Sequence, residues 1–166
     1  MRSGCSLVIL AGGLSRRMGH DKATLPAGDG TLVDHLPGLG PLAGMLAGLT
    51  AASHRHVWVV GCDLPDVEPA LGDLLLSLAA DYEAVVPQPA EEPEGVCALY
   101  VRELAPRIAA LLDAGERSIK SLLRRSKVRY VASGELQSAD PQLRSFRNLN
   151  TQADYEDWLR TQPVSR

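Results

Sequence analysis

The chain has 166 residues, of which 45% are hydrophobic and 22% charged, a balance typical of one ordinary globular domain. Its net charge of −3 and isoelectric point of about 5.8 exclude the broad basic surface that duplex DNA requires. No apolar run is long enough to cross a membrane, and the cysteines have neither zinc-binding spacing nor the even number of a disulfide framework. We therefore expect a cytoplasmic protein that binds neither nucleic acid nor a membrane.

Short apolar segments that end at glycine, proline or polar residues predict the strands of a buried sheet. The first, SLVIL at residues 6–10, is stopped by Gly12 and Gly13, and HVWVVGCD at 56–63 has the same character. Three further candidates follow: EAVVPQ at residues 83–88, VCALYV at 96–101 and VRYVA at 128–132.

Segments with helical patterns lie between or after these strands. They span residues 41–53, 68–81, 103–115, 118–126 and 152–160. Thr151 caps the last one through Asp154 in its first turn. Residues 87–95, rich in proline and acid, predict a solvated, mobile loop. The alternation of strands and helices predicts an α/β fold, a mostly parallel sheet flanked by helices.

One region does not fit this alternation. Residues 31–36 have the pattern of the opening of a helix, yet they run directly into PGLGPLAG at 37–44. That leaves no room for a full helix, a strand and its return, because a parallel crossover needs a dozen or more residues. Either the connection is unusual, or residues are absent between Leu36 and Pro37. A Cα–Cα distance well above about 3.8 Å between these two residues would mark a break.

The loop after the first strand combines glycines with positive charge. Ligands of a parallel α/β sheet bind outside the carboxyl ends of its strands, where this loop must lie. Gly12 and Gly13 let the backbone approach a ligand closely and offer N–H groups to phosphate oxygens. The positive charge comes from Arg16, Arg17 and Lys22. The spacing matches neither GxxxxGK[ST] nor GxGxxG, so neither familiar phosphate motif applies.

Asp63 follows the second buried strand and faces the same crevice as the first loop. Magnesium prefers one or two carboxylates plus substrate phosphates, so a single aspartate suffices for a metal site; otherwise Asp63 only caps the next segment. Asp66 is expected to be a turn residue. Asn148 and Asn150 alternate along an extended stretch, which points both side chains to one face. They serve one shared site or form the turn into the last helix.

Gly40, Gly44 and Gly48 lie on one stripe of the helix that begins near residue 41. Interior helix glycines cost roughly 1 kcal/mol each relative to alanine, so each needs a packing or ligand reason. Close packing on the sheet is one explanation. Approach of a nucleotide to Gly40 and the helix start is the other.

The first loop, LAGGLSRRMGHDK at residues 10–22, resembles the signature LAGGxSxRMGxDK of molybdenum cofactor guanylyltransferases. Three later segments agree in order: GPLAG at 40–44, GCDLP at 61–65 and FRNLNTQADYE at 146–156. The double glycine differs from the LAAG of related cytidylyltransferases. Ser15 and Met18 differ from the LAGGxGTRL of sugar-nucleotide pyrophosphorylases.

The resemblance implies a single three-layer, Rossmann-like nucleotidyltransferase domain over residues 1–166. Its activity would be transfer of GMP from GTP to the terminal phosphate of molybdopterin, with release of pyrophosphate. Other proteins of molybdenum cofactor biosynthesis are the implied partners. Roughly 30 or more residues normally separate the first helix from GPLAG in the family, the length of a strand and its crossover. That segment supplies further nucleotide contacts, for which this chain has no matching positions.

The resemblance also assigns site residues. The catalytic residues are Lys22, Arg17 and Asp63, and Asp63 would hold Mg²⁺, with Mn²⁺ as an alternative. The residues expected to contact the nucleotide are Leu10, Ala11, Gly12, Gly13, Ser15, Lys22, Gly40, Gly44, Asp63, Asn148 and Asn150. A group of cations could attract the acceptor's phosphate or form a solvated face: Lys120, Arg124, Arg125, Lys127 and Arg129.

Two other functions remain open at this point. One is cytidylyl transfer in the same cofactor pathway. The other is a degenerate nucleotide-binding module that keeps the loop without the chemistry.

Overall fold

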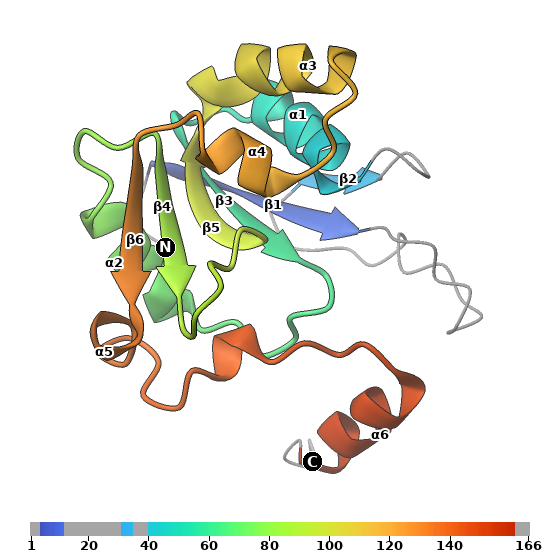
Figure 1. Cartoon of the computed structure of the whole chain (residues 1–166). Helices are drawn as coiled ribbons and strands as arrows, with labels where there is room; N and C mark the ends of the chain where they lie inside the picture. The colour runs from blue at the N-terminus through green and yellow to red at the C-terminus, as the bar shows by residue number, and fades with distance from the viewer. Residues whose placement is uncertain (1–3, 12–30, 35–39, 162–166) are drawn as a thin grey trace.

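The computed structural model describes residues 4–11, 31–34 and 40–161, and within them six strands form one sheet (Figure 1). The strands are β1 (Cys5–Ala11), β2 (Thr31–Asp34), β3 (His56–Gly61), β4 (Ala84–Gln88), β5 (Cys97–Val101) and β6 (Val128–Ala132). Their order in the sheet is β2-β1-β3-β5-β4-β6. Of these six, only β5 runs antiparallel to its neighbours, so the mostly parallel sheet predicted from the sequence is confirmed.

Helices cover both faces of the sheet and give it three layers (Figure 1). One face carries α1 (Pro41–Ala51), α3 (Ala105–Asp113) and α4 (Ile119–Leu123), and the other carries α2 (Pro69–Ser77) and α5 (Ser133–Leu136). Two short 3₁₀ turns are η2 (Arg102–Leu104) and η3 (Arg144–Phe146). The last helix, α6 (Gln152–Thr161), lies apart from both layers, at the lower right of Figure 1. Within the described residues, no helix combines the length and apolarity that a membrane span needs.

Local sequence explains where the helices begin. Pro41 occupies the first turn of α1, where its fixed φ suits the helix and its missing N–H costs nothing. The residue before it, Gly40, has φ +72°, which a side chain would disfavour. At α6, the Asp154 carboxylate accepts from the N–H of Thr151 at 2.8 Å, and the Thr151 hydroxyl accepts from the N–H of Asp154 at 3.1 Å. This reciprocal capping pair confirms the predicted start of the last helix.

The core has two halves, one on each face of the sheet. On the first, Leu42, Met45 and Leu49 of α1 are buried against β1. On the second, Leu71 and Leu75 of α2 pack with buried strand residues. A Cβ on Gly48 would lie 2.5 Å from the Val8 Cγ1, so this glycine allows α1 to approach the sheet closely. At Gly48, the packing explanation for the glycine stripe is the correct one.

The region that did not fit the alternation forms an edge strand. Thr31–Asp34 pairs in parallel with the end of β1 as β2, so the expected helix opening is wrong. The β-branched Thr31 and Val33 favour an extended backbone, and pairing with β1 satisfies backbone groups of the segment. The expected gap between Leu36 and Pro37 lies outside the described residues.

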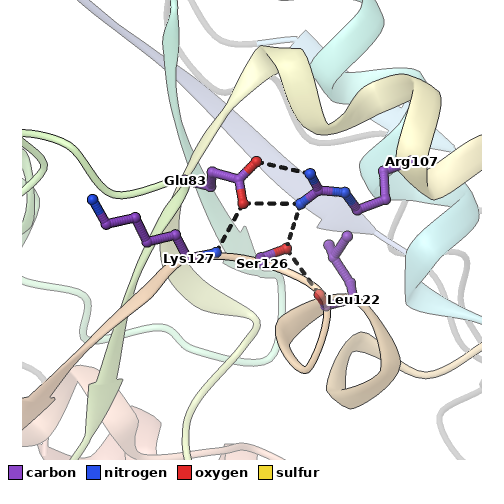
Figure 2. A network of polar contacts seen from close by, with 5 residues as sticks. All are labelled: Glu83, Arg107, Leu122, Ser126 and Lys127. Atoms are coloured by element: carbon purple, nitrogen blue, oxygen red, sulfur yellow. Dashed lines mark hydrogen bonds and ion pairs between the residues drawn. The ribbon is translucent and has the colours of Figure 1, made fainter.

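A polar network joins one end of β4 to the α3 and α4 layer (Figure 2). The Arg107 guanidinium donates to both carboxylate oxygens of Glu83 at 2.9 Å, and also to the Ser126 hydroxyl. The same carboxylate accepts from the Lys127 N–H at 2.8 Å, and the Ser126 hydroxyl donates to the carbonyl of Leu122. The network fixes the turn that leads from α4 into β6.

Candidate functional site

The carboxyl ends of β1 and β3 lie side by side in the sheet. Leu10 pairs with Gly61 in the parallel register, and the Cys62 N–H donates to the Leu10 carbonyl at 3.0 Å. Ala11, the last residue of β1, therefore ends at the same edge as the turn that carries Asp63. Gly12 and the rest of the glycine loop follow Ala11 in the sequence, and they lie outside the described residues.

Asp63 folds back over the end of its own strand. A Cβ on Gly61 would lie 2.5 Å from the Asp63 Oδ1, so the carboxylate occupies space that only glycine leaves open. Among the described residues, no group forms a hydrogen bond with the Asp63 carboxylate. A half-buried carboxylate without a protein partner, at the carboxyl end of a buried strand, is suited to a ligand or metal ion.

The two asparagines reach this turn from the far end of the chain. The Leu149 N–H donates to the Asp63 carbonyl at 2.8 Å. Leu149 is only 8% exposed, whereas Asn148 and Asn150 on either side of it are exposed. This alternation agrees with the expectation that both asparagine side chains share one face. The structure thus brings the backbone of the segment that carries Asn148 and Asn150 against the backbone of Asp63.

Asp66 is more than the turn residue that the sequence suggested. Its side chain is 9% exposed, and its Oδ1 accepts from the indole Nε1 of Trp158 at 2.8 Å. The guanidinium of Arg144 lies 3.8 Å from the same oxygen. Sequence reasoning missed this role because Trp158 lies 92 positions further along the chain and no spacing links the two.

A second acidic residue that sequence reasoning missed is Glu94, in the loop between β4 and β5. The loop closes on the end of β3, where the Gly61 N–H donates to the Val96 carbonyl at 2.7 Å. Burial raises the pKa of the half-buried Glu94 carboxyl above its ordinary value, opposed by a hydrogen bond from Val96, and the charge of Asp63 adds to the rise. The prediction of a solvated loop is therefore wrong at Glu94. The acid-rich composition offered no signal of this burial.

An open groove of about 350 Å³ lies beside Glu94. It is lined by Pro41, Pro93, Glu94, Gly95, Val96, Arg117, Ser118, Ile119, Lys120 and Leu123. A Cβ on Gly40 would lie 3.0 Å from the Arg117 carbonyl oxygen, so the start of α1 packs closely on this wall. The Arg117 guanidinium donates to the carbonyls of Leu112 and Glu116, which holds it in place.

The structure shows where several other residues expected at the site lie. Leu10 and Ala11 end β1 beside Asp63, whereas Gly44 is buried within α1. Of the expected cations, Lys120 lines the groove and forms an ion pair with Glu92. Arg124 and Arg129 form side-chain hydrogen bonds, and the Lys127 ammonium lies above the Tyr82 ring. Five expected site residues lie outside the described ranges: Gly12, Gly13, Ser15, Arg17 and Lys22.

Comparison with known proteins identifies the family to which the chain belongs. The sequence model described as "MobA-like NTP transferase domain" matches residues 7–36 and 32–130. A molybdenum cofactor guanylyltransferase from Desulfosudis oleivorans is 33% identical over 118 residues, which cover 70% of this chain and 58% of that protein. One from Syntrophotalea carbinolica is 29% identical over 95% of this chain and 92% of that protein.

The solved structures agree on the fold. Molybdopterin-guanine dinucleotide biosynthesis protein A from Archaeoglobus fulgidus superposes with a TM-score of 0.75 over 92% of this chain and 95% of that protein, at 23% identity. With the first curated relative, the matched part of the chain spans little more than half of the relative's length. The sequence match runs through β1, the Asp63 turn and the β4–β5 loop, the elements that build the site. The chain therefore belongs to the family of MobA-like NTP transferase domains.

Proposed function

We propose that this chain transfers GMP from GTP to the terminal phosphate of molybdopterin and releases pyrophosphate. The observation that carries the proposal is the meeting of β1 with the Asp63 turn, because it brings Leu10 and Ala11, the first two residues of LAGG, to the same edge of the sheet as the Asp63 carboxylate, which has no hydrogen-bond partner among the described residues. The names of the two guanylyltransferase relatives support the choice of GTP and of the acceptor.

The nucleotide is held mainly by the loop after β1. Its backbone from Leu10 to Gly13, together with Ser15, contacts the triphosphate, while Arg17 and Lys22 balance the phosphate charge. Asn148 and Asn150 reach the same place from the C-terminal segment, beside the Asp63 carbonyl. Gly40, at the start of α1, and Gly44, in its first turns, are also assigned to the nucleotide; Gly40 lies against the Arg117 carbonyl beside the groove.

The oxygen atoms beside the Asp63 turn fit a magnesium ion. Within the described residues, no three His, Cys, Asp or Glu side chains gather closely enough to hold a metal by themselves. The candidate oxygen ligands are the Asp63 carboxylate and the Glu94 carboxyl, whose pKa is raised in part by the charge of Asp63, together with the amide of Asn150, whose neighbour Leu149 is bonded to the Asp63 carbonyl. Magnesium takes few protein carboxylates and completes its shell with water and substrate phosphates, so this sparse set suits it. When bound there, the ion would neutralise phosphate charge and orient the phosphate oxygens.

The reaction needs no general base from the protein. A phosphate monoester is largely dianionic near neutral pH because its second pKa is about 6. One of its oxygens attacks the α-phosphorus of GTP and forms the new P–O bond. The bond between the α-phosphorus and the bridging oxygen breaks, and pyrophosphate leaves with that electron pair. Lys22 and Arg17 stabilise the charge that develops on pyrophosphate, and Asp63 would hold the metal ion beside the phosphates.

We assign the acceptor, molybdopterin, to the groove beside Glu94. The groove adjoins the Asp63 turn through Gly95 and Val96, and its far wall carries Arg117 and Lys120, the latter in an ion pair with Glu92. Its volume of about 350 Å³ suits a small organic molecule. An acceptor seated here would direct its phosphate toward the end of β3.

We also propose that the chain is one domain that lacks an internal segment of its relatives, between Leu36 and Pro37. The alignment with the S. carbinolica protein has 195 positions, 29 more than the 166 residues of this chain. At least that many positions of the relative therefore have no counterpart. The family model supports the location, because it matches in two pieces that meet at residues 32–36.

A pyrophosphate-release assay tests the activity. The purified chain is incubated with Mg²⁺, molybdopterin and either GTP or CTP. We expect pyrophosphate only when the acceptor is present, and faster with GTP. Faster release with CTP would instead make the protein a cytidylyltransferase. Thermal stabilisation by GTP without any pyrophosphate would make it a nucleotide-binding module.

A further inference from the structure

The turn after β3 is held by the C-terminal segment at three points. The Asp63 carbonyl accepts from the Leu149 N–H at 2.8 Å, and the Glu68 N–H donates to the Ser145 hydroxyl at 3.0 Å. Between them, the Asp66 carboxylate accepts from the Trp158 indole at 2.8 Å. The segment from η3 to α6 therefore lies along the whole turn that carries the candidate metal ligand.

The hydrogen bond to Asp66 is stronger than the other two, and Asp66 also lies near a second residue of the C-terminal segment. Asp66 is nearly buried at 9% exposure, and hydrogen bonds to an ionised carboxylate are stronger than those between neutral groups. Its acceptor oxygen also lies near the Arg144 guanidinium, at the start of η3. One carboxylate thus contacts both ends of the segment that contains Asn148 and Asn150.

The helix that carries Trp158 is the last element of the described chain. In Figure 1, α6 lies away from the sheet and from both helical layers. Its indole ring stacks on Tyr155 of the same helix, with 6.0 Å between the ring centroids. Tyr155 and Leu159 remain exposed. The hydrogen bond from Trp158 to Asp66 is therefore an anchor that fixes where this helix sits.

The position of α6 decides where Asn150 lies. The Asp154 carboxylate, in the first turn of α6, accepts from the N–H of Asn150 at 3.0 Å and from that of Thr151. Asn150 is thus tied to the helix start on one side. On the other, its neighbour Leu149 is tied to Asp63. A shift of α6 would be transmitted to Asn150 through these short links.

We propose that Asp66 is a positioning residue, which anchors α6 through Trp158 and η3 through Arg144 and so holds Asn148 and Asn150 beside Asp63. The role of the two asparagines rests on the proposed function. The anchoring itself does not, and it can be measured without any substrate.

The anchoring is tested by NMR on the whole chain. The protein has two tryptophans and therefore two indole N–H signals, of which only Trp158 is hydrogen-bonded to a carboxylate. In Asp66→Ala, the Trp158 indole signal should shift, and the Leu149 amide should exchange about tenfold faster or more, as expected for the loss of a charge-assisted hydrogen bond. Asp66→Asn keeps an acceptor oxygen and should preserve much of both signals.

The functional consequence is tested by the magnesium dependence of GMP transfer. Both Asp66→Ala and Trp158→Phe should raise the half-saturating Mg²⁺ concentration and lower kcat by about tenfold, as expected when ligands lose their fixed positions. Asp66→Asn should recover most of the wild-type magnesium dependence. Asp73→Ala removes an exposed carboxylate from α2 and serves as the matched control, with no expected change.

The outcomes separate the two proposals. Unchanged Leu149 exchange and an unchanged indole signal in Asp66→Ala would overturn the anchoring, whatever the enzyme does. Faster exchange with normal magnesium dependence would overturn the positioning role alone. If the wild-type chain transfers no nucleotide, the proposed function fails while the NMR result still decides the anchoring. Trp158→Phe and Asp66→Asn keep the test valid if Asp66→Ala does not fold.

Discussion

Gly61 leaves the space into which the Asp63 carboxylate folds, and this makes it the sharpest single test of the site. In Gly61→Ala the new Cβ would meet the Asp63 Oδ1 at 2.5 Å, while the next nearest side chain is 3.6 Å away. The carboxylate end is flexible, so it should move rather than disrupt the strand. We expect turnover to fall by about tenfold or more, because small misplacements at a reacting centre are costly.

The matched control for this substitution is Gly134→Ala in α5. A Cβ there would have no atom within 4 Å, and its backbone is helical. That variant should keep wild-type turnover. Thermal unfolding of both variants checks that the fold survives. An equal drop in turnover for the two would show that the effect at residue 61 does not act through Asp63.

The charge of Asp63 and that of Lys22 should each be needed for turnover but not for folding. Asp63→Ala removes the proposed metal ligand, and Lys22→Ala removes a cation that balances pyrophosphate. Both variants should lose at least about a hundredfold in turnover, on the scale of a lost transition-state contact. Circular dichroism and pyrophosphate release are the two measurements. Wild-type-like GMP transfer by either variant would refute its assignment.

Single residues were predictable where a strand end or a motif marked them. The position of Asp63 at a strand end and the shared face of the two asparagines could be predicted because each follows a recognisable pattern in the sequence. Glu94 and Asp66 could not, because their burial and partners come from distant parts of the chain: the β4–β5 loop closing on β3, and Trp158 reaching back from α6. Tertiary contacts of this kind leave no trace in local spacing.

At the scale of elements, the long apolar and periodic segments were predicted well and the short ones were not. The strands at β1, β3, β4, β5 and β6 and the longer helices all match segments chosen from hydrophobic pattern. The short β2 and α5 were missed. Four residues carry too little periodicity to distinguish a strand from a helix opening, and backbone pairing with β1 decides the matter at β2.

The ion pair in Figure 2 predicts how stability varies with acidity. Hydrogen bonds from Arg107, and then from the Lys127 N–H, lower the pKa of Glu83 below its ordinary value of 4.5, against a smaller opposing effect of burial. Because the pKa of Glu83 is lower in the folded state, the ion pair contributes to the free energy of unfolding at pH values above the unfolded-state pKa. This contribution is lost as the pH falls through the folded-state value.

A double-mutant cycle with Glu83→Gln and Arg107→Ala measures this contribution. Both side chains are about one-third exposed, so solvent screening limits the expected coupling to about 1 kcal/mol at pH 7. The coupling should disappear below the folded-state pKa of Glu83. Urea unfolding at pH 7 and at a series of lower pH values provides the comparison. A coupling that stays constant through the pH at which the Glu83 carboxyl titrates, followed by NMR, would show that the charge of Glu83 is not what stabilises the β4 end.

For the molecule as a whole, the proposed lack of a segment between Leu36 and Pro37 bears on which base is chosen. The resemblance implies that this segment supplies nucleotide contacts in the family. A site that hydrogen-bonds a base rejects the wrong one by about 10⁴ to 10⁵, whereas shape alone gives about 200-fold or less. A chain without the segment should therefore discriminate poorly between GTP and CTP.

We predict that this chain prefers GTP over CTP in kcat/KM by less than about a hundredfold, the range that shape and the LAGG loop can supply. Insertion of the corresponding segment of the S. carbinolica protein between Leu36 and Pro37 should raise the preference at least about tenfold, because new hydrogen bonds to guanine would form. A flexible glycine-serine insert of equal length is the control, and it should add nothing. A wild-type chain that already matches the relative's preference would mean that guanine is recognised by residues this chain retains.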